Sequence, residues 1–225
     1  MNALSRHKAK SSNTYWAVVR AFNAYLFALL MLVAAADAGE RPVVLALGDS
    51  LTAGYGLAPG KAFPAQLQVA LAGNGIDAKV INGGVSGDTS AGGLARLDWL
   101  LGDKPDLVIV ELGANDGLRG LDPDGTRDNL DRIIMRIRET GAHVLLTGMV
   151  APPNLGSDYG ERFNAIYPAL AQKHGTAFYP FFLDGVAMDP ALNQQDGIHP
   201  TAEGVAMIVE KILPVVIGGL AEAAK

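Results

Sequence analysis

The sequence predicts an α/β fold built as a three-layer α/β/α sandwich around a parallel five-stranded sheet. Five short runs are rich in Val, Ile and Leu without polar alternation, which is typical of parallel strands buried on both faces. Segments with apolar residues at helical spacing separate these runs. Strand–helix alternation with connections of this length requires right-handed crossovers, and it places helices on both faces of the sheet.

Each element follows from its own pattern. The expected strands are 43–47, 78–82, 107–111, 143–147 and 177–181. The helical patterns lie within 63–71, 94–101, 130–137, 163–170 and 205–216. The chain shows no internal repeat, linker or low-complexity segment, so its main part is expected to form one doubly wound domain.

The composition excludes several classes of protein. The chain has 225 residues, of which 49% are hydrophobic and 18% charged, and this balance excludes a disordered polymer. It contains no cysteine, which excludes a disulfide scaffold, a thiolate nucleophile, a zinc ribbon and a lipidated cysteine anchor. The formal net charge of −5 argues against nucleic-acid binding.

The first 38 residues have the pattern of a secretory signal peptide. Four basic and no acidic residues lie within 1–20, an apolar run follows at 24–36, and 36–38 read Ala-Asp-Ala. A retained membrane anchor is the alternative, but 13 helical residues rise only about 20 Å and the hydrocarbon core is about 30 Å thick. We expect cleavage after Ala38, a mature domain of 39–225 with net charge −8, no stable membrane anchor, and a periplasmic or secreted location.

The loops that follow the expected strands carry the polar residues of interest. In an open parallel sheet, ligands bind at the carboxyl edge where the strand order reverses. Ser50 lies just past the first strand, at the expected start of a helix. One interpretation is a helix N-cap, and the other is a nucleophile. The residues around it lack the second glycine of the G-x-S-x-G elbow.

His199 is the candidate base. It follows Asp196 by three residues, and this spacing lets the carboxylate take the Nδ1 proton of the imidazole and leave Nε2 free. The alternative is an Asp turn before a helix opened by Pro200. His143 and His174 are expected to be structural, one starting a strand and the other ending a helix.

Three further groups could stabilise an oxyanion. The Ser50 amide, the Gly87 amide and the Asn115 side chain come from three neighbouring loops, although each loop alone could be an ordinary turn. Asp88 and Asp116 are expected to order these loops and to take no part in chemistry. An acid-side loss of activity is expected as the histidine base protonates.

Four blocks, GDSLTAGYGL, GVSGDTSAGGLARL, VELGANDGLRG and QQDGIHP, resemble in order and spacing the signature blocks of SGNH (GDSL-type) hydrolases. The likeness is closest to the bacterial periplasmic thioesterase I/lysophospholipase/arylesterase branch. It implies Ser50 as the nucleophile, His199 as the base and Asp196 as its orienting acid. It also implies an oxyanion hole of Ser50, Gly87 and Asn115, and a flavodoxin-like fold without cofactor or metal.

The expected function is therefore an exported serine esterase acting on small-molecule acyl esters and thioesters, with lysophospholipids as substrates. A polysaccharide O-deacetylase with the same chemistry and a catalytically silent binding module are the alternatives. A phosphate-binding loop is disfavoured, because 56–62 has three residues between its glycines and ends in Ala62. A monomer is expected. Leu57, Val85, Leu118 and Leu155 could hold an acyl chain or simply pack their own loops.

Overall fold

The structure is a computed structural model, and it describes residues 16–20, 22–23, 25 and 41–225. The chain divides into two units, Met1–Arg41 and Pro42–Lys225. In the first unit, residues 16–20, 22–23 and 25 are helical, and Arg41 has no regular secondary structure. The rest of the predicted signal peptide, including the expected cleavage site after Ala38, lies outside the described residues.

The second unit contains a five-stranded, fully parallel sheet with the order β2-β1-β3-β4-β5. The strands are β1 (Val43–Gly48), β2 (Lys79–Gly84), β3 (Leu107–Glu111), β4 (His143–Thr147) and β5 (Ala177–Tyr179). The three central strands are almost completely buried, as their apolar composition requires.

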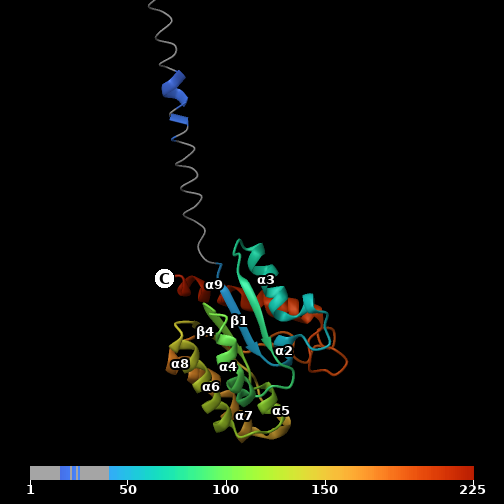
Figure 1. The fold of residues 1–225 in the computed structure, drawn as a ribbon. Coiled ribbons are helices and arrows are strands. Elements are labelled where there is room, and N and C mark those ends of the chain that lie inside the picture. The colour runs from blue at the N-terminus through green and yellow to red at the C-terminus, as the bar shows by residue number, and fades with distance from the viewer. Residues whose placement is uncertain (1–15, 21, 24, 26–40) are drawn as a thin grey trace, which may run out of the picture. The chain divides into compact units, whose positions relative to one another are not determined.

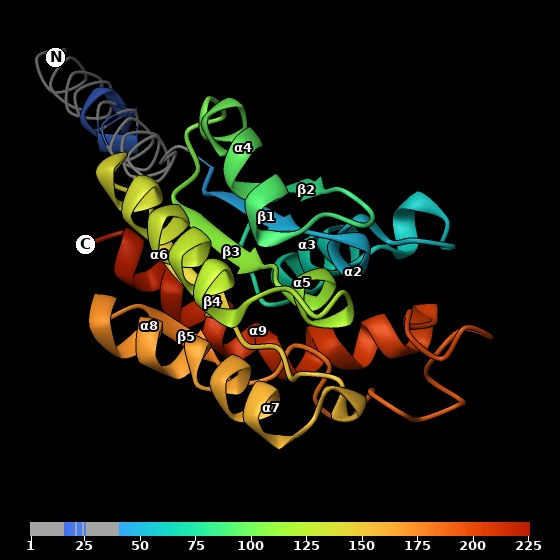
Figure 2. The same cartoon turned by 90° about the horizontal axis from the view of Figure 1, so that it is seen from below.

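Helices cover both faces of this sheet. The helices are α2 (Ser50–Ala53), α3 (Phe63–Gly73), α4 (Ser90–Leu101), α5 (Ala114–Leu118), α6 (Pro123–Glu139), α7 (Ser157–Asn164), α8 (Ile166–His174) and α9 (Ala202–Ala223), with short 3-10 turns η1 (Pro59–Lys61) and η2 (Pro153–Leu155). Helices α3 and α9 pack together on one face, and α4, α6 and α8 form the other layer (Figures 1 and 2). The predicted three-layer α/β/α sandwich is confirmed.

Local differences from the predicted elements have physical reasons. The pattern at 163–170 belongs to two helices, α7 and α8, which meet at Ala165. Strand β5 ends at Tyr179 before Pro180, whose nitrogen cannot donate a strand hydrogen bond. Pro200 does not open the last helix, because Thr201 caps α9 by accepting a hydrogen bond from the Gly204 N–H.

Helix α9 is long and apolar. Of the described helices, it alone has the length and hydropathy of a membrane span, with 44% of the apolar window buried. Its buried side chains pack against the sheet and α3, which makes it a core helix of this layer.

The strand order fixes where a ligand can approach. The chain runs from β1 to β2 on one side and then crosses to β3 on the other, so the order reverses between β1 and β3. In open α/β sheets, ligands bind outside the carboxyl ends of the strands at such a reversal. Ser50 begins α2, just after β1, and Asn115 lies in α5, just after β3.

Candidate active site

Ser50 is the first residue of α2, and Asp49 is the N-cap. The Asp49 Oδ1 atom accepts a hydrogen bond from the Leu51 N–H at 2.9 Å. The interpretation of Ser50 as the N-cap is therefore wrong, since a carboxylate one residue earlier satisfies the helix start. The Ser50 hydroxyl is left free to face the loop before α9.

The structure brings His199 and Asp196 to that hydroxyl. The His199 Nε2 atom lies 2.9 Å from Ser50 Oγ, and the Nδ1 atom lies 2.7 Å from Asp196 Oδ2. The three side chains thus form a continuous hydrogen-bonded chain that links residues 149 positions apart. In Figure 1 the loop before α9 lies beside α2, on the carboxyl side of β1. This is the geometry that general-base activation of a hydroxyl requires.

Asp196 is held in its ionised form. Hydrogen bonds from the His199 side chain, the His199 N–H and the Ile198 N–H lower the pKa of Asp196 to about 2. The carboxylate therefore stays charged at every pH at which the protein would work. A fixed carboxylate on Nδ1 selects the imidazole tautomer whose Nε2 faces Ser50.

Gln194 and Tyr55, which sequence analysis missed, hold this loop against the end of α2. The Gln194 side-chain amide donates to the Tyr55 carbonyl at 2.8 Å and to the Pro200 carbonyl at 3.0 Å. The Gln194 N–H donates to the His199 carbonyl at 2.7 Å. The Tyr55 ring lies against the imidazole, with ring centroids 4.5 Å apart. The QQDGIHP block contained Gln194, but no local signal paired it with Tyr55.

The other two predicted site residues flank Ser50. The Asn115 side-chain amide, on α5, donates to Asp49 Oδ2 at 2.9 Å, which fixes its position beside the Ser50 turn. Gly87 has a φ of +81°, a conformation that glycine adopts without strain, and its carbonyl accepts from Arg119 at 2.7 Å. Among the described residues, the N–H groups of Ser50 and Gly87 make no hydrogen bond, so both remain available as donors.

A second buried carboxyl group, Glu111, lies under the turn and was also missed. Its Oε2 atom accepts from Thr52 Oγ1 at 2.7 Å and from the Asp49 N–H at 3.3 Å. Burial, and then the neighbouring Asp49, raise the pKa of Glu111 well above its usual value. Burial also raises the pKa of Asp49, to about 6, against the lowering effect of the Leu51 and Asn115 hydrogen bonds.

Gly48 makes room for this arrangement. It pairs with Glu111 across β1 and β3. A Cβ on Gly48 would lie 2.0 Å from Thr52 Oγ1 and 2.5 Å from Glu111 Oε2. The glycine of the GDSL block is therefore needed for close approach of these side chains, independently of backbone φ.

The remaining predicted loop residues have structural partners. Asp116 accepts hydrogen bonds from the Ser90 N–H and hydroxyl and from Thr126, so it ties α5 to α4 and α6. Asp88 pairs with Arg96 at 2.7 Å. His174 lies 2.6 Å from Asp131 at the far end of α8.

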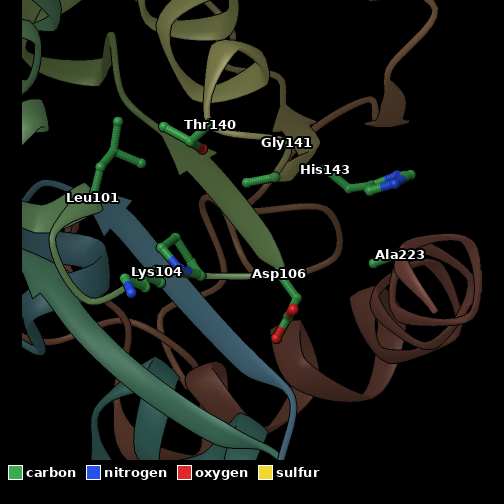
Figure 3. A pocket seen from close by; sticks show the side chains of 9 residues that line it. Leu101, Lys104, Asp106, Thr140, Gly141, His143 and Ala223 are labelled. Atoms are coloured by element: carbon green, nitrogen blue, oxygen red, sulfur yellow. The ribbon is translucent and has the colours of Figure 1, made fainter. Parts of the chain in front are cut away.

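A separate pocket of about 450 Å³ lies near the amino ends of β3 and β4, opposite the Ser50 site (Figure 3). It is lined by Lys104, Asp106, Thr140 and His143 among others. In Figure 3 the Lys104, Asp106 and His143 side chains point in different directions and do not converge on one point. Within the described part of the chain, no cluster of three or more His, Asp or Glu side chains could hold a metal ion.

Comparison with known proteins identifies the same family that the four sequence blocks around Ser50, Gly87, Asn115 and His199 resemble. Residues 46–207 match the GDSL-like lipase/acylhydrolase family. This chain belongs to that family. The match runs from β1 into α9 and so includes every segment of the site.

Three curated relatives of this GDSL family are similar over most of their length. An esterase TesA from Pseudomonas aeruginosa is 44% identical over 82% of this chain and 92% of its own. An arylesterase from Vibrio mimicus is 44% identical over 86% and 95%. The thioesterase 1/protease 1/lysophospholipase L1 of Escherichia coli K12 is 41% identical over 83% and 87%.

A solved structure gives the same fold. The crystal structure of TesA superposes with a TM-score of 0.75 at 44% identity, covering 79% of this chain and 99% of the other. The fold and family predicted from the sequence are thus confirmed.

Proposed function

We propose that this GDSL-family chain is an exported serine esterase that hydrolyses acyl esters and thioesters through Ser50, His199 and Asp196. The observation that carries the proposal is the continuous chain of hydrogen bonds, 2.9 Å from Ser50 Oγ to Nε2 and 2.7 Å from Nδ1 to Asp196. A hydroxyl, a base and a carboxylate that orients the base are the three parts of acyl-transfer catalysis.

In the first half of the reaction, Ser50 Oγ attacks the acyl carbonyl carbon while His199 Nε2 takes its proton. The tetrahedral intermediate then collapses, and Nε2 returns that proton to the departing alkoxide or thiolate. In the second half, water attacks the acyl-Ser50 carbonyl and gives its proton to Nε2. Collapse of this intermediate releases the carboxylic acid, and the proton returns to Ser50 Oγ.

The negative oxygen of each intermediate is assigned to the N–H groups of Ser50 and Gly87 and the side-chain amide of Asn115. The first two donors have no partner within the described residues, and Asn115 uses one of its two N–H bonds on Asp49. Donors that are already in place stabilise an oxyanion without a cost of reorganisation.

The substrate is assigned as an ester with an apolar acyl chain. Each segment that supplies a site residue also exposes an apolar side chain at this edge: Tyr55, Val85, Leu118 and Ile198, each 46–53% exposed. These four residues, here called the apolar rim, would cover an alkyl chain whose carbonyl lies at Ser50. The names of the curated relatives, which include arylesterase and thioesterase 1/lysophospholipase L1, support the same substrate class.

Hydrolysis of p-nitrophenyl esters from acetyl to palmitoyl tests this proposal, with Ser50→Ala and Thr140→Ala as matched substitutions that each remove one hydroxyl. Thr140 lies just before β4, at the edge of the sheet opposite Ser50. We expect turnover of medium or long chains by the wild type and Thr140→Ala, and loss of turnover in Ser50→Ala. A strict acetyl preference would favour the polysaccharide O-deacetylase. Inactivity of the wild type on every ester would leave a silent binding module.

Export is proposed from the leader at 1–38. Mass spectrometry of the protein recovered from a bacterial host tests it. We expect a periplasmic or secreted chain that begins at Gly39, whereas a full-length chain in the membrane fraction would contradict cleavage.

A further inference from the structure

Glu111 contacts both sides of the turn that presents Ser50. It ends β3, directly across the sheet from Gly48, and its side chain is completely buried. Its Oε2 atom receives the Asp49 N–H, just before Ser50, and the Thr52 hydroxyl, two residues after it. One carboxyl oxygen therefore fixes the backbone and the first helical turn around the reacting hydroxyl.

The surroundings of Glu111 favour its neutral form. Its Oε1 atom makes no hydrogen bond to any residue that the structure describes, and an unpaired buried carboxylate oxygen is costly. Asp49 lies on the adjoining strand end, and its negative charge opposes a second one. From α5 and α8, Asp116 and Tyr167 also face this interior, and neither supplies a positive charge.

The groups on the other side of Asp49 explain why, of the two carboxyl groups, Asp49 carries the negative charge and Glu111 does not. The Arg96 guanidinium, on α4, donates to the Gly48 carbonyl at 2.8 Å and pairs with Asp88. His199 faces Asp49 from the loop before α9 and favours its ionised form. The Asp49 carboxylate also receives two N–H bonds, from Leu51 and Asn115, whereas Glu111 has one oxygen with none.

We propose that Glu111 works as a neutral carboxylic acid that positions the oxyanion hole: it holds the Ser50 turn and leaves Asp49 as the one carboxylate that orients the Asn115 amide. This inference rests on the proposed role of Asn115. A proton on Asp49 instead would weaken the acceptor of the Asn115 N–H, and the amide would lose its fixed orientation. Glu111 is thus a positioning residue that acts through Asp49 and Thr52, with no contact to substrate.

Two substitutions of Glu111 distinguish the role of its acceptor oxygen from the role of its acidic proton. Glu111→Met keeps the length but removes the acceptor, so two buried donors lose their partner and kcat should fall roughly 10- to 100-fold. KM should stay within about twofold, because the rim is untouched. Glu111→Gln is neutral and keeps an acceptor oxygen, and it should restore kcat to within about threefold of the wild type. A Gln variant as slow as Met would overturn the neutral-acid role.

A double-mutant cycle tests the route of action. In the Asn115→Ala background, Glu111→Met should lower kcat by no more than about twofold further, because the amide that it positions is gone. An undiminished loss in that background would mean that Glu111 does not act through the oxyanion hole, and would overturn the proposal. A merely structural role would not produce both recovery of kcat in Glu111→Gln and non-additivity with Asn115→Ala.

The protonation state is measured without reference to activity. The infrared spectrum of the wild type at pH 8 should contain the C=O stretching band of a protonated carboxylic acid, and Glu111→Gln should lack it. An active wild type without that band overturns the inference and leaves the proposed function intact. A wild type that has the band but hydrolyses no ester refutes the proposed function, and the positioning role falls with it.

Discussion

The replacement of Asn115 by alanine removes two things at once. It deletes the amide proposed to bind the oxyanion, and it breaks the 2.9 Å hydrogen bond to Asp49 Oδ2. Loss of one oxyanion donor lowers kcat by about 100- to 1000-fold, equivalent to about 3–4 kcal/mol of transition-state stabilisation. Ground-state binding through the apolar rim is unchanged, so KM should change little.

The same substitution has a pH-dependent effect on stability. Asp49 is 1% exposed, and this burial raises its pKa to about 6. The hydrogen bond from Asn115 opposes part of that increase. Without that bond the pKa of Asp49 in the folded protein rises further. The variant should then lose about 1.5–3 kcal/mol of unfolding free energy at pH 8, where wild-type Asp49 is ionised. At pH 5 Asp49 is protonated in both proteins, and the difference should shrink.

The assay combines the rate of p-nitrophenyl butyrate hydrolysis with thermal unfolding at pH 5 and pH 8. Asn74→Ala is the matched control, since among the described residues the Asn74 side-chain amide donates only to the Ala70 carbonyl, at the end of α3. It should leave kcat unchanged. An Asn115→Ala enzyme with kcat within threefold of the wild type, or with equal destabilisation at both pH values, would refute the reasoning.

The further predictions concern the base, the turn and helix α6. Asp196→Asn should lower kcat by about 100- to 10,000-fold, because the amide cannot hold the required tautomer of His199. Hydrogen bonds from His199 lower the pKa of Asp196 to about 2, so the stability that this carboxylate contributes is lost only as the pH falls from about 4 through 2. Wild-type kcat/KM measured between pH 4 and 8 should therefore show no inflection from Asp196. Gly48→Ala should yield unfolded or inactive protein, since its Cβ would meet Thr52 Oγ1 at 2.0 Å. Gly125 lies in α6, and a Cβ there would meet nothing within 4 Å. Gly125→Ala should therefore raise the free energy of unfolding by up to about 1 kcal/mol, as measured by thermal unfolding.

The sequence predicted the sheet well where burial alone decides the element. Strands β3 and β4 match the predicted 107–111 and 143–147, because both are buried on both faces. Strand β2 runs to Gly84, two residues further than predicted, because its pairing with β1 continues through two glycines that carry no hydrophobic signal. The break at Ala165 was invisible in a continuous apolar pattern.

The site divides in a similar way. That Ser50, Asp196 and His199 lie together could be predicted from their segments, since the fold class brings the connections after the strands to one edge of the sheet. Glu111 and Gln194 could not, because their partners lie 59 and 139 residues away and their importance depends on burial and on packing of the loops. Glu111 in particular reads in sequence as the polar end of a strand, and only the three-dimensional register places it under Asp49.

The most direct test of the central claim, that Ser50 is the nucleophile, is covalent labelling with a p-nitrophenyl alkylphosphonate. Attack of Ser50 Oγ on phosphorus would expel p-nitrophenolate and leave a stable phosphonyl ester on the serine. We predict stoichiometric release of p-nitrophenolate by the wild type, a matching mass increase that maps to the peptide containing Ser50, and no label in Ser50→Ala. A label on another residue, or equal labelling of Ser50→Ala, would contradict the account.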